Sequence, residues 1–289
     1  MAEATFRGRC AGPGFPPTSD IPMDRLAFWR LLKTRYGYQS PPRPLRIPWW
    51  LATPAYYAGV LDVVFRHGRV ACRGAYNRAF WAAGALEIIR IVEAVGGRVE
   101  ITGLSGQARH PEPVVFVANH MSMIDAFFLP GILLPFRNIT FVVKKSLLDY
   151  PLFGSVMRAV RPVAVSRENP RDDLRKVITE GEAHLADGRS MVVFPQATRS
   201  PVFDRTIFNS LGVKLARRAG VMVVPVALKT DFQGHGRFLK DLGRIDPRNT
   251  IHIAFGAPIP VEGAGQATHE RVAAFIADHL RRWGAEVRS

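Results

Sequence analysis

The pattern of apolar and polar positions changes its texture at about residue 98. Downstream of that point, short β-branched and aromatic runs alternate with segments of helical periodicity. Several runs are apolar at successive positions, which is typical of strands covered on both faces. The predicted strands are 99–102, 114–119, 138–144, 161–166, 191–194, 221–228 and 251–256. The helical segments with one apolar face are 171–187, 207–219 and 268–283. This alternation predicts an α/β domain over 98–289, with a mainly parallel or mixed sheet flanked by helices.

The N-terminal part of the chain has a different pattern. Residues 1–40 form an extension whose first 22 residues are rich in Gly, Pro and Ser, and a basic amphipathic helix is predicted over 23–37. Such a helix places apolar area beside positive charge, which suits a membrane surface.

Residues 41–97 contain two apolar helical segments. The first, 47–61, carries no charge and contains Pro48 and Pro54, which predicts a kinked hydrophobic helix. The second is predicted over 76–95. Because a spanning helix needs roughly 20 apolar residues, we expect this hydrophobic and amphipathic pair to lie in or against one leaflet. A pair of buried core helices is the alternative.

The charge of the chain indicates its class of partner. Its 39 basic and 24 acidic residues give a formal net charge of +15, which suits an anionic membrane, an acidic carrier protein, a phosphorylated substrate or nucleic acid. The aromatic residues Trp49, Trp50, Tyr56 and Tyr57 cluster in one apolar stretch. This arrangement is typical of a membrane interface and argues against nucleic acid as the partner.

The two cysteines and the N-terminus bear on the compartment. Cys10 and Cys72 give neither a metal-ligand spacing nor a disulfide framework. The N-terminus lacks the apolar central region of a signal peptide. The sequence therefore predicts a cytosol-facing protein.

The first cluster of polar residues follows the strand predicted over 114–119. Asn119 and His120 lie at its end, and Asp125 begins the apolar segment that follows. On one continuous helix the last two would lie about 140° apart. They meet only if His120 lies in the turn before the helix and Asp125 lies in or near its first turn. A carboxylate in that position would orient the imidazole as a general base; a histidine that merely caps the helix is the alternative.

Basic residues follow three other predicted strands. Lys145, Arg167 and Arg199, the last beside Thr198, all lie just past a strand end, as His120 does. In open α/β sheets, ligands gather at the carboxyl ends of strands. Arginine holds phosphate bidentately and lysine adds a point charge. A general base beside such residues indicates a hydroxyl substrate that carries a phosphate.

Four motifs in this order resemble those of the glycerolipid acyltransferases, which include the 1-acylglycerol-3-phosphate O-acyltransferases. They are NHxxxxD at 119–125, a strand that ends at Arg167, FPxxTRS at 194–200 and VPVAL at 224–228. The resemblance covers about residues 98–260. It extends more loosely to the hydrophobic segments before them.

The resemblance implies roles for these residues. His120 would be the general base and Asp125 would orient it, while Arg167, Thr198, Arg199 and Lys145 would bind the glycerol phosphate of the acceptor. Loop or orienting roles would fall to Asn119, Gln196, Ser200 and Pro225, although a proline within an apolar strand favours an edge or bulge position. The family uses acyl-CoA or acyl carrier protein as the donor and acts at the cytoplasmic face of a membrane. No metal or redox cofactor is expected.

The motifs depart from the family pattern at three positions. FPQATRS stands where FPEGTRS is usual, so Gln196 replaces a carboxylate and Ala197 replaces a glycine. Ser166 stands where an acidic residue usually precedes the arginine. Each of the changes at 166 and 196 removes negative charge beside the expected acceptor pocket, and Ala197 does not easily adopt a positive φ.

These features predict transfer of an acyl chain to a lysophospholipid, foremost 1-acyl-sn-glycerol 3-phosphate, to give phosphatidic acid. Other acceptors, such as a lyso-ornithine lipid, a glycolipid or another lysophospholipid, are alternatives. So is a catalytically inactive, membrane-bound lipid-binding protein.

Overall fold

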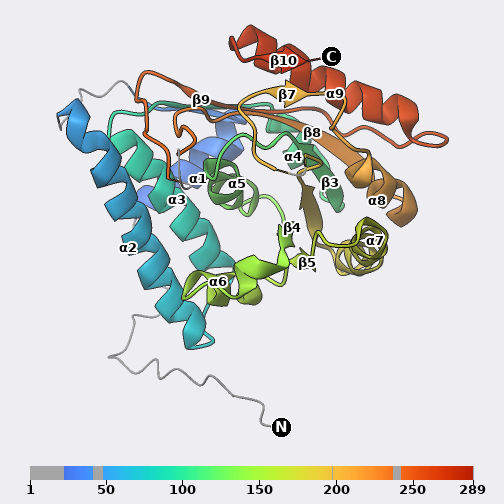
Figure 1. Cartoon of the computed structure of the whole chain (residues 1–289), viewed down its shortest axis with the longest axis horizontal. Coiled ribbons are helices and arrows are strands. Elements are labelled where there is room, and N and C mark those ends of the chain that lie inside the picture. The colour runs from blue at the N-terminus through green and yellow to red at the C-terminus, as the bar shows by residue number, and fades with distance from the viewer. Residues whose placement is uncertain (1–22, 42–47, 197, 237–241, 289) are drawn as a thin grey trace.

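The computed structural model of the chain describes residues 23–41, 48–196, 198–236 and 242–288. Its centre is an eight-stranded sheet in the order β1-β2-β9-β8-β3-β6-β4-β5 (Figure 1). The strands are β1 Tyr38–Gln39, β2 Val99–Thr102, β3 Val114–Ala118, β4 Ile139–Lys144, β5 Val163–Val165, β6 Ser190–Val193, β8 Met222–Lys229 and β9 Ile251–Phe255. A separate parallel pair joins β7 Phe203–Asp204 to β10 Val287–Arg288. All seven strands predicted from the sequence are present, with ends shifted by at most two residues.

The sheet is mixed, as predicted. Strands β8, β3, β6, β4 and β5 are neighbours in that order and run parallel. Strand β9 is antiparallel to β8, and β1 is antiparallel to β2. Every residue of β3 and β6 is buried, which explains why these strands are apolar at successive positions. Their carboxyl ends lie at one edge, where the polar clusters follow.

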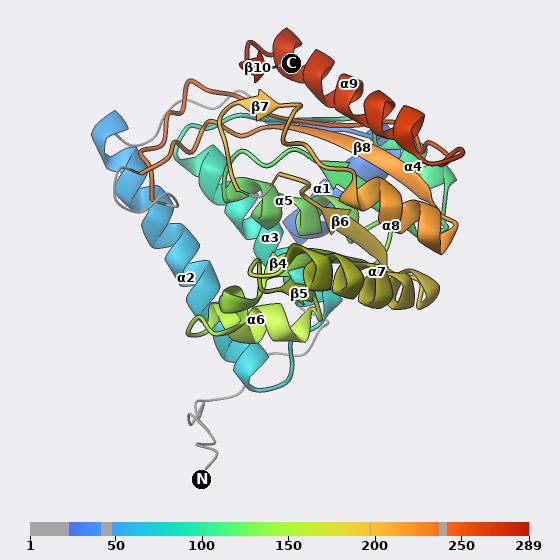
Figure 2. The same ribbon diagram turned by 45° about the vertical axis from the view of Figure 1, so that its right-hand side comes forward.

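Helices cover both faces of the sheet (Figures 1 and 2). Even-numbered residues of β3 pack with the first group of helices, and odd-numbered residues pack with the second. The first group is α1 Met23–Arg35, α2 Ala52–Cys72, α3 Arg78–Ala94 and α5 Ile124–Leu133. The second is α7 Pro170–Ala186, α8 Leu211–Ala219 and α9 Gln266–Arg282. The shorter helices are α4 Ser105–Arg109, α6 Phe153–Ala159, η1 Trp49–Leu51 and η2 Lys145–Leu148. The predicted α/β fold, a mixed sheet flanked by helices, is therefore confirmed.

The hydrophobic helix α2 differs from its prediction. It runs without interruption for 21 residues from Ala52, so the predicted kink is wrong. Pro54 lies in the first turn, where its missing N–H has no intrahelical partner to lose. None of the helices in the described part of the chain is long and apolar enough to cross a membrane.

Helix α2 has two apolar faces. One, which includes Tyr56, Val60 and Val63, is buried against the rest of the protein. The opposite side leaves Leu61 65% and Phe65 49% exposed. Large apolar side chains that stay this exposed make this side of the helix a candidate contact surface.

Arginines near the helix pair are largely used within the protein. Arg25 from α1 and Arg66 from α2 each bond Glu87 of α3 at 2.6 Å. Burial alone would raise the pKa of Glu87, but interactions with His67 and Arg66 outweigh it and lower the pKa from its usual 4.5 to about 2. These ion pairs join the first three helices. Fewer positive charges are therefore free to attract an anionic lipid surface than the sequence suggests.

Candidate active site

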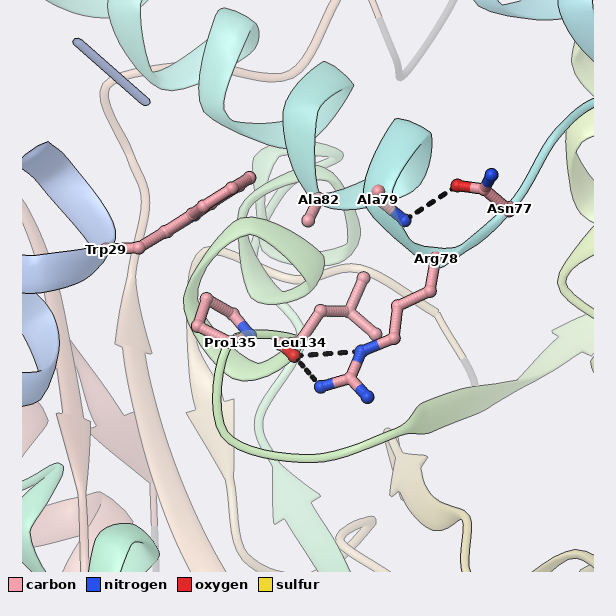
Figure 3. A pocket seen from close by; sticks show the side chains of 7 residues that line it. All are labelled: Trp29, Asn77, Arg78, Ala79, Ala82, Leu134 and Pro135. Atoms are coloured by element: carbon pink, nitrogen blue, oxygen red, sulfur yellow. Dashed lines mark hydrogen bonds between the residues drawn. The ribbon is translucent and has the colours of Figure 1, made fainter. Parts of the chain in front are cut away.

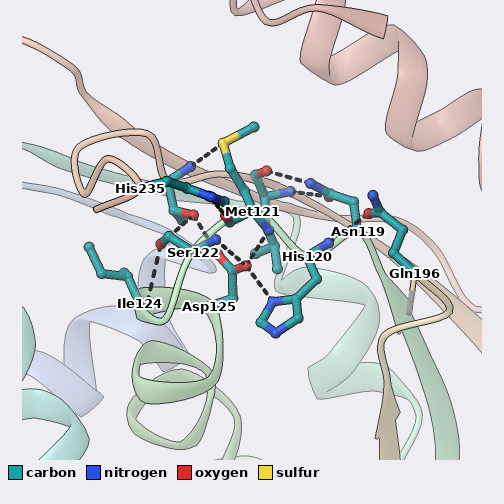
Figure 4. A network of polar contacts seen from close by, with 10 residues as sticks. Asn119, His120, Met121, Ser122, Ile124, Asp125, Gln196 and His235 are labelled. Carbon is teal, nitrogen blue, oxygen red and sulfur yellow. Dashed lines mark hydrogen bonds and ion pairs between the residues drawn. The ribbon is translucent and has the colours of Figure 1, made fainter. Parts of the chain in front are cut away.

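The imidazole of His120 and the carboxylate of Asp125 are in contact at the carboxyl end of β3. His120 lies in the turn after the strand, and Asp125 lies in the first turn of α5. The distance from His120 Nδ1 to Asp125 Oδ2 is 2.8 Å (Figure 4). Because a carboxylate only accepts, Nδ1 carries the hydrogen and Nε2 keeps its lone pair. This is the arrangement that the five-residue spacing requires.

The carboxylate of Asp125 is fully buried and surrounded by donors. Oδ2 also accepts from the backbone N–H groups of Met121 at 2.6 Å and Ser122 at 3.0 Å. Oδ1 accepts from the hydroxyl of Thr230 at 2.5 Å, which in turn accepts from the hydroxyl of Ser122 at 2.9 Å. A carboxylate held by this many donors is fixed in position.

Thr230 and Ser122 are site residues that the sequence analysis missed. Thr230 directly follows β8, one position past its last residue, and Ser122 lies inside the NHxxxxD motif. The available signal was a hydroxyl residue just past a buried strand. Sequence periodicity cannot tell which of many such residues reaches a carboxylate 105 positions away.

The backbone of His120 is held from both sides by the FPQATRS segment. Its N–H donates to Oε1 of Gln196 at 2.9 Å, and its carbonyl accepts from the N–H of Ser200 at 2.9 Å. The imidazole stacks on Phe194, with ring centroids 4.2 Å apart and planes 17° from parallel. This segment therefore positions the imidazole rather than only lining a pocket. Ala197 lies outside the described residues.

Gln196 is 98% buried, since its relative exposure is 2%. Its amide oxygen is used by His120, while Nε2 has no hydrogen-bond partner within the described residues. The replacement of the usual glutamate thus keeps the acceptor that His120 needs. It places an uncharged amide where a second carboxylate oxygen would otherwise be buried.

We expect Gln196→Ala to lower the free energy of unfolding by about 1–3 kcal/mol, because a buried N–H at His120 loses its acceptor. Gln107→Ala is the matched control, since Gln107 is equally buried and neither of its amide atoms has a partner in the described part of the chain. Gln196→Glu retains an acceptor oxygen and is expected to keep most of the activity that Gln196→Ala loses. Urea unfolding and turnover measure these effects. Equal losses of unfolding free energy in the two alanine variants would show that the hydrogen bond to His120 adds no stability of its own.

Asn119 and Pro225 belong to the sheet rather than to the dyad. The side chain of Asn119 exchanges two hydrogen bonds with the backbone of Leu228, of 2.7 and 2.8 Å, and so extends the pairing of β3 with β8. Pro225 lies inside β8 opposite Val117 of β3. Strand β8 is an interior strand, so the edge position is excluded and the bulge is left, and Pro225 lies in a strand rather than in a loop.

An interior proline is tolerated here for a local reason. The carbonyl of Pro225 accepts from the N–H of Gly256, the residue after the end of β9. Because the N–H and C=O of one strand residue point to the same neighbouring strand, the N–H that proline lacks would also face β9. Pro225 is paired with Gly256, and the next bridge pairs Val223 with Ile259. Between these two pairs β8 advances by two residues and the segment after β9 advances by three. The bulge predicted for Pro225 is thus present, and its extra residue lies in the segment that follows β9.

The predicted phosphate-binding residues follow adjacent parallel strands. Arg199 follows β6, Lys145 follows β4 and Arg167 follows β5, in that order outward from His120 after β3. With strands about 4.8 Å apart, the end of β5 lies about 14 Å from the end of β3. Lys145, Arg167 and Thr198 are exposed and Arg199 is half-buried. The fold thus brings these residues to the edge of the sheet that carries the dyad.

A separate pocket of about 390 Å³ lies near the other end of α5 (Figure 3). There, Arg78 of α3 donates two hydrogen bonds to the carbonyl of Leu134, just past the end of the helix. Its lining residues are Trp29, Asn77, Arg78, Ala79, Ala82, Leu134 and Pro135. None of these is a predicted site residue. Within the described residues, no three His, Cys, Asp or Glu side chains are grouped to hold a metal ion.

Comparison with known proteins identifies the class. A family model described as Acyltransferase matches residues 98–229. The chain is 30% identical over 185 residues to a 1-acyl-sn-glycerol-3-phosphate acyltransferase of Pseudomonas aeruginosa, covering 64% of this chain and 67% of that protein. It is also 30% identical over 182 residues to a lyso-ornithine lipid O-acyltransferase of the same organism, covering 59% and 68%.

The fold has a solved counterpart. The crystal structure of the 1-acyl-sn-glycerophosphate (LPA) acyltransferase PlsC from Thermotoga maritima aligns with a TM-score of 0.62 at 20% identity, covering 81% of this chain and 95% of that one. This likeness shows the fold. Together with the sequence matches, it establishes that the chain is an acyltransferase and belongs to the glycerolipid acyltransferase family.

Proposed function

We propose that the protein transfers a fatty acyl chain from an acyl thioester to the free hydroxyl of 1-acyl-sn-glycerol 3-phosphate, giving phosphatidic acid. The observation that carries this proposal is the contact between His120 Nδ1 and Asp125, which leaves Nε2 as a proton acceptor. The basic residues at the neighbouring strand ends supply charge for a phosphate. The name of the Pseudomonas acyltransferase supports the same acceptor.

In the proposed step, Nε2 of His120 takes the proton from the acceptor hydroxyl. The oxygen attacks the thioester carbonyl, a C–O bond forms, and the C–S bond breaks. The imidazolium returns its proton to the leaving thiolate, so atoms and charge balance. Asp125 stabilises the imidazolium between these events. No covalent acyl-enzyme, metal or redox cofactor is required.

Four backbone N–H groups beside the dyad are not available to stabilise the tetrahedral oxyanion. The N–H groups of His120, Met121, Ser122 and Ser200 are already donated within the protein. An oxyanion needs donors aimed at its own position. The acyl thioester must therefore place its carbonyl against other groups at this edge of the sheet.

The charge of the site favours a phosphate over an ornithine headgroup. Ornithine carries an ammonium, and the carboxylate of the dyad, Asp125, is already occupied by four donors. Gln196 and Ser166 occupy two positions where the family pattern has acidic residues. A lyso-ornithine lipid remains the second candidate, because a relative of that name is 30% identical to this chain.

We also propose that α2 contacts the cytoplasmic face of an anionic membrane, where both lipid acceptor and product reside. Support comes from the exposed side chains of Trp50, Leu61 and Phe65, with Arg69 placed 5.4 Å from the centre of the Phe65 ring. Apolar and aromatic groups flanked by arginine suit a lipid interface. Either acyl-CoA or acyl carrier protein is the donor, and the second would use the basic surface of the enzyme.

An acceptor panel with thiol release as the readout tests the function. Purified protein and acyl-CoA are offered 1-acyl-sn-glycerol 3-phosphate, a lyso-ornithine lipid, a lysoglycolipid and lysophosphatidylcholine. We expect the highest kcat/KM with the glycerol phosphate. Preference for the ornithine acceptor would replace the leading assignment with the second. Saturable lipid binding without thiol release with any of the acceptors would indicate a lipid-binding protein.

A further inference from the structure

The turn that follows β5 has an unusual backbone. Arg167 adopts a φ of +65°, in the left-handed region that residues with a Cβ rarely occupy. Such a conformation persists where surrounding contacts hold it, and it is found more often at functional sites. The backbone conformation of a residue sets the direction of its Cα–Cβ bond, so this φ decides where the arginine side chain begins.

One carboxylate holds this turn. Asp173, in the first turn of α7, accepts from the backbone N–H of Ser166 at 2.9 Å and of Arg167 at 2.7 Å. It also accepts from the hydroxyl of Ser166 at 3.3 Å. Two successive N–H groups that converge on one anion form the concave backbone arrangement typical of anion binding. Here the anion is supplied by the protein itself.

The carboxylate at this turn therefore comes from another element. Position 166 is a serine, so residue 166 cannot contribute an acidic side chain, yet Asp173 places a negative charge against its N–H and hydroxyl. The serine leaves this turn without an acidic side chain of its own, and the carboxylate of Asp173 faces the backbone of the turn.

The direction of the Arg167 side chain matters because of its place in the sheet. β5 is the outermost strand on this side, three strands from β3 and the dyad. At about 4.8 Å per strand, its end lies about 14 Å from the end of β3. A guanidinium there contributes to one site with His120 only if it is directed inward along the sheet edge.

We propose that Asp173 is a positioning residue for acceptor binding. Its carboxylate holds the Ser166–Arg167 turn in the left-handed conformation that presents Arg167 to the anionic headgroup of the acceptor. This inference rests on the proposed function, in which Arg167 contacts the phosphate. Asp173 itself does not touch the acceptor, since its oxygens are occupied by the turn.

A double-mutant cycle tests the proposal. The variants are Asp173→Ala, Arg167→Ala and the double variant. Asp172→Ala is the matched control, because Asp172 is the neighbouring exposed carboxylate and its side chain accepts from Asn169 rather than from the turn. We expect Asp173→Ala to raise KM for 1-acyl-sn-glycerol 3-phosphate by about tenfold, with KM for acyl-CoA unchanged. The double variant is expected to be no worse than Arg167→Ala, since both changes remove one interaction. The control is expected to behave as wild type.

The outcomes separate the two proposals. If Arg167→Ala raises the acceptor KM but Asp173→Ala does not, or if the two effects multiply, Asp173 does not act through Arg167 and the inference is overturned. If Arg167→Ala leaves the acceptor KM unchanged, the assigned role of Arg167 fails and the inference falls with it. Absence of turnover by the wild-type enzyme with this acceptor overturns the proposed function instead. Asp173→Asn, which keeps one acceptor oxygen, replaces the alanine variant if that protein does not fold, and a raised acceptor KM at normal kcat is again expected.

Discussion

His120→Ala is expected to abolish thiol release in the presence of acceptor, with a fall in kcat of at least about 10²–10⁴-fold, the usual contribution of a general base. The imidazole is the group whose Nε2 can take the hydroxyl proton while Nδ1 is held by Asp125. Without it, the acceptor oxygen must attack the thioester as a neutral hydroxyl. The measurement is single-turnover and steady-state thiol release with 1-acyl-sn-glycerol 3-phosphate.

The structure indicates that this variant should fold. The bonds from Gln196 Oε1 and Ser200 N engage the backbone of residue 120, so alanine retains both. His235→Ala is the matched control, because its imidazole also lies near the dyad and its recorded contact is from Nε2 to the carbonyl of Met121 (Figure 4). We expect that control to retain most of the activity. Undiminished turnover by folded His120→Ala protein would exclude His120 as the base.

Asp125→Asn is the second variant for which we expect a large effect, a loss of kcat of about 10²–10⁴-fold. Asparagine has almost the same shape as aspartate. Its amide oxygen can still accept from Met121 N and Ser122 N, and its amide nitrogen can donate to the hydroxyl of Thr230. The variant therefore removes the negative charge from the dyad while leaving most hydrogen bonds in place. What it loses is the stabilisation of the imidazolium.

Asp125→Ala provides the comparison for this charge effect. It removes the same charge but also leaves the N–H groups of Met121 and Ser122 without their acceptor, so stability is expected to fall by about 1–3 kcal/mol per unsatisfied buried group. Thermal unfolding and kcat are measured on both variants. If the asparagine variant keeps its activity within about threefold of wild type, the charge of Asp125 contributes little to the transition state. Its role would then be limited to holding the turn.

Local sequence patterns predicted most of the secondary-structure elements of the fold. Runs of β-branched residues and one-sided helical periods are local signals, so all seven predicted strands and the helices between them are found in the structure. The five-residue spacing of His120 and Asp125 is also local, and it set the condition for their contact, a turn between the strand and the helix. The interpretation of Pro54 as a kink failed because its effect depends on where the helix begins.

The residues that surround the dyad were decided by the tertiary structure. Gln196 reaches His120 across 76 positions and Thr230 reaches Asp125 across 105. Such contacts depend on which strands become neighbours. The hydrophobic periodicity of a single element does not show the order of β3, β6 and β8 in the sheet. For Pro225 the sequence left an edge and a bulge open for the same reason, since only strand order shows that β8 is interior.

The sequence by itself therefore determined the α/β class, the strand ends that carry polar residues, and the imidazole–carboxylate pair. Only the tertiary structure decided that FPQATRS holds the backbone of His120, that Thr230 fixes Asp125, and that Asp173 holds Arg167. The physical reason is that periodicity reports which way a side chain faces along its own element. The partner it meets depends on the packing of elements that are distant in the chain.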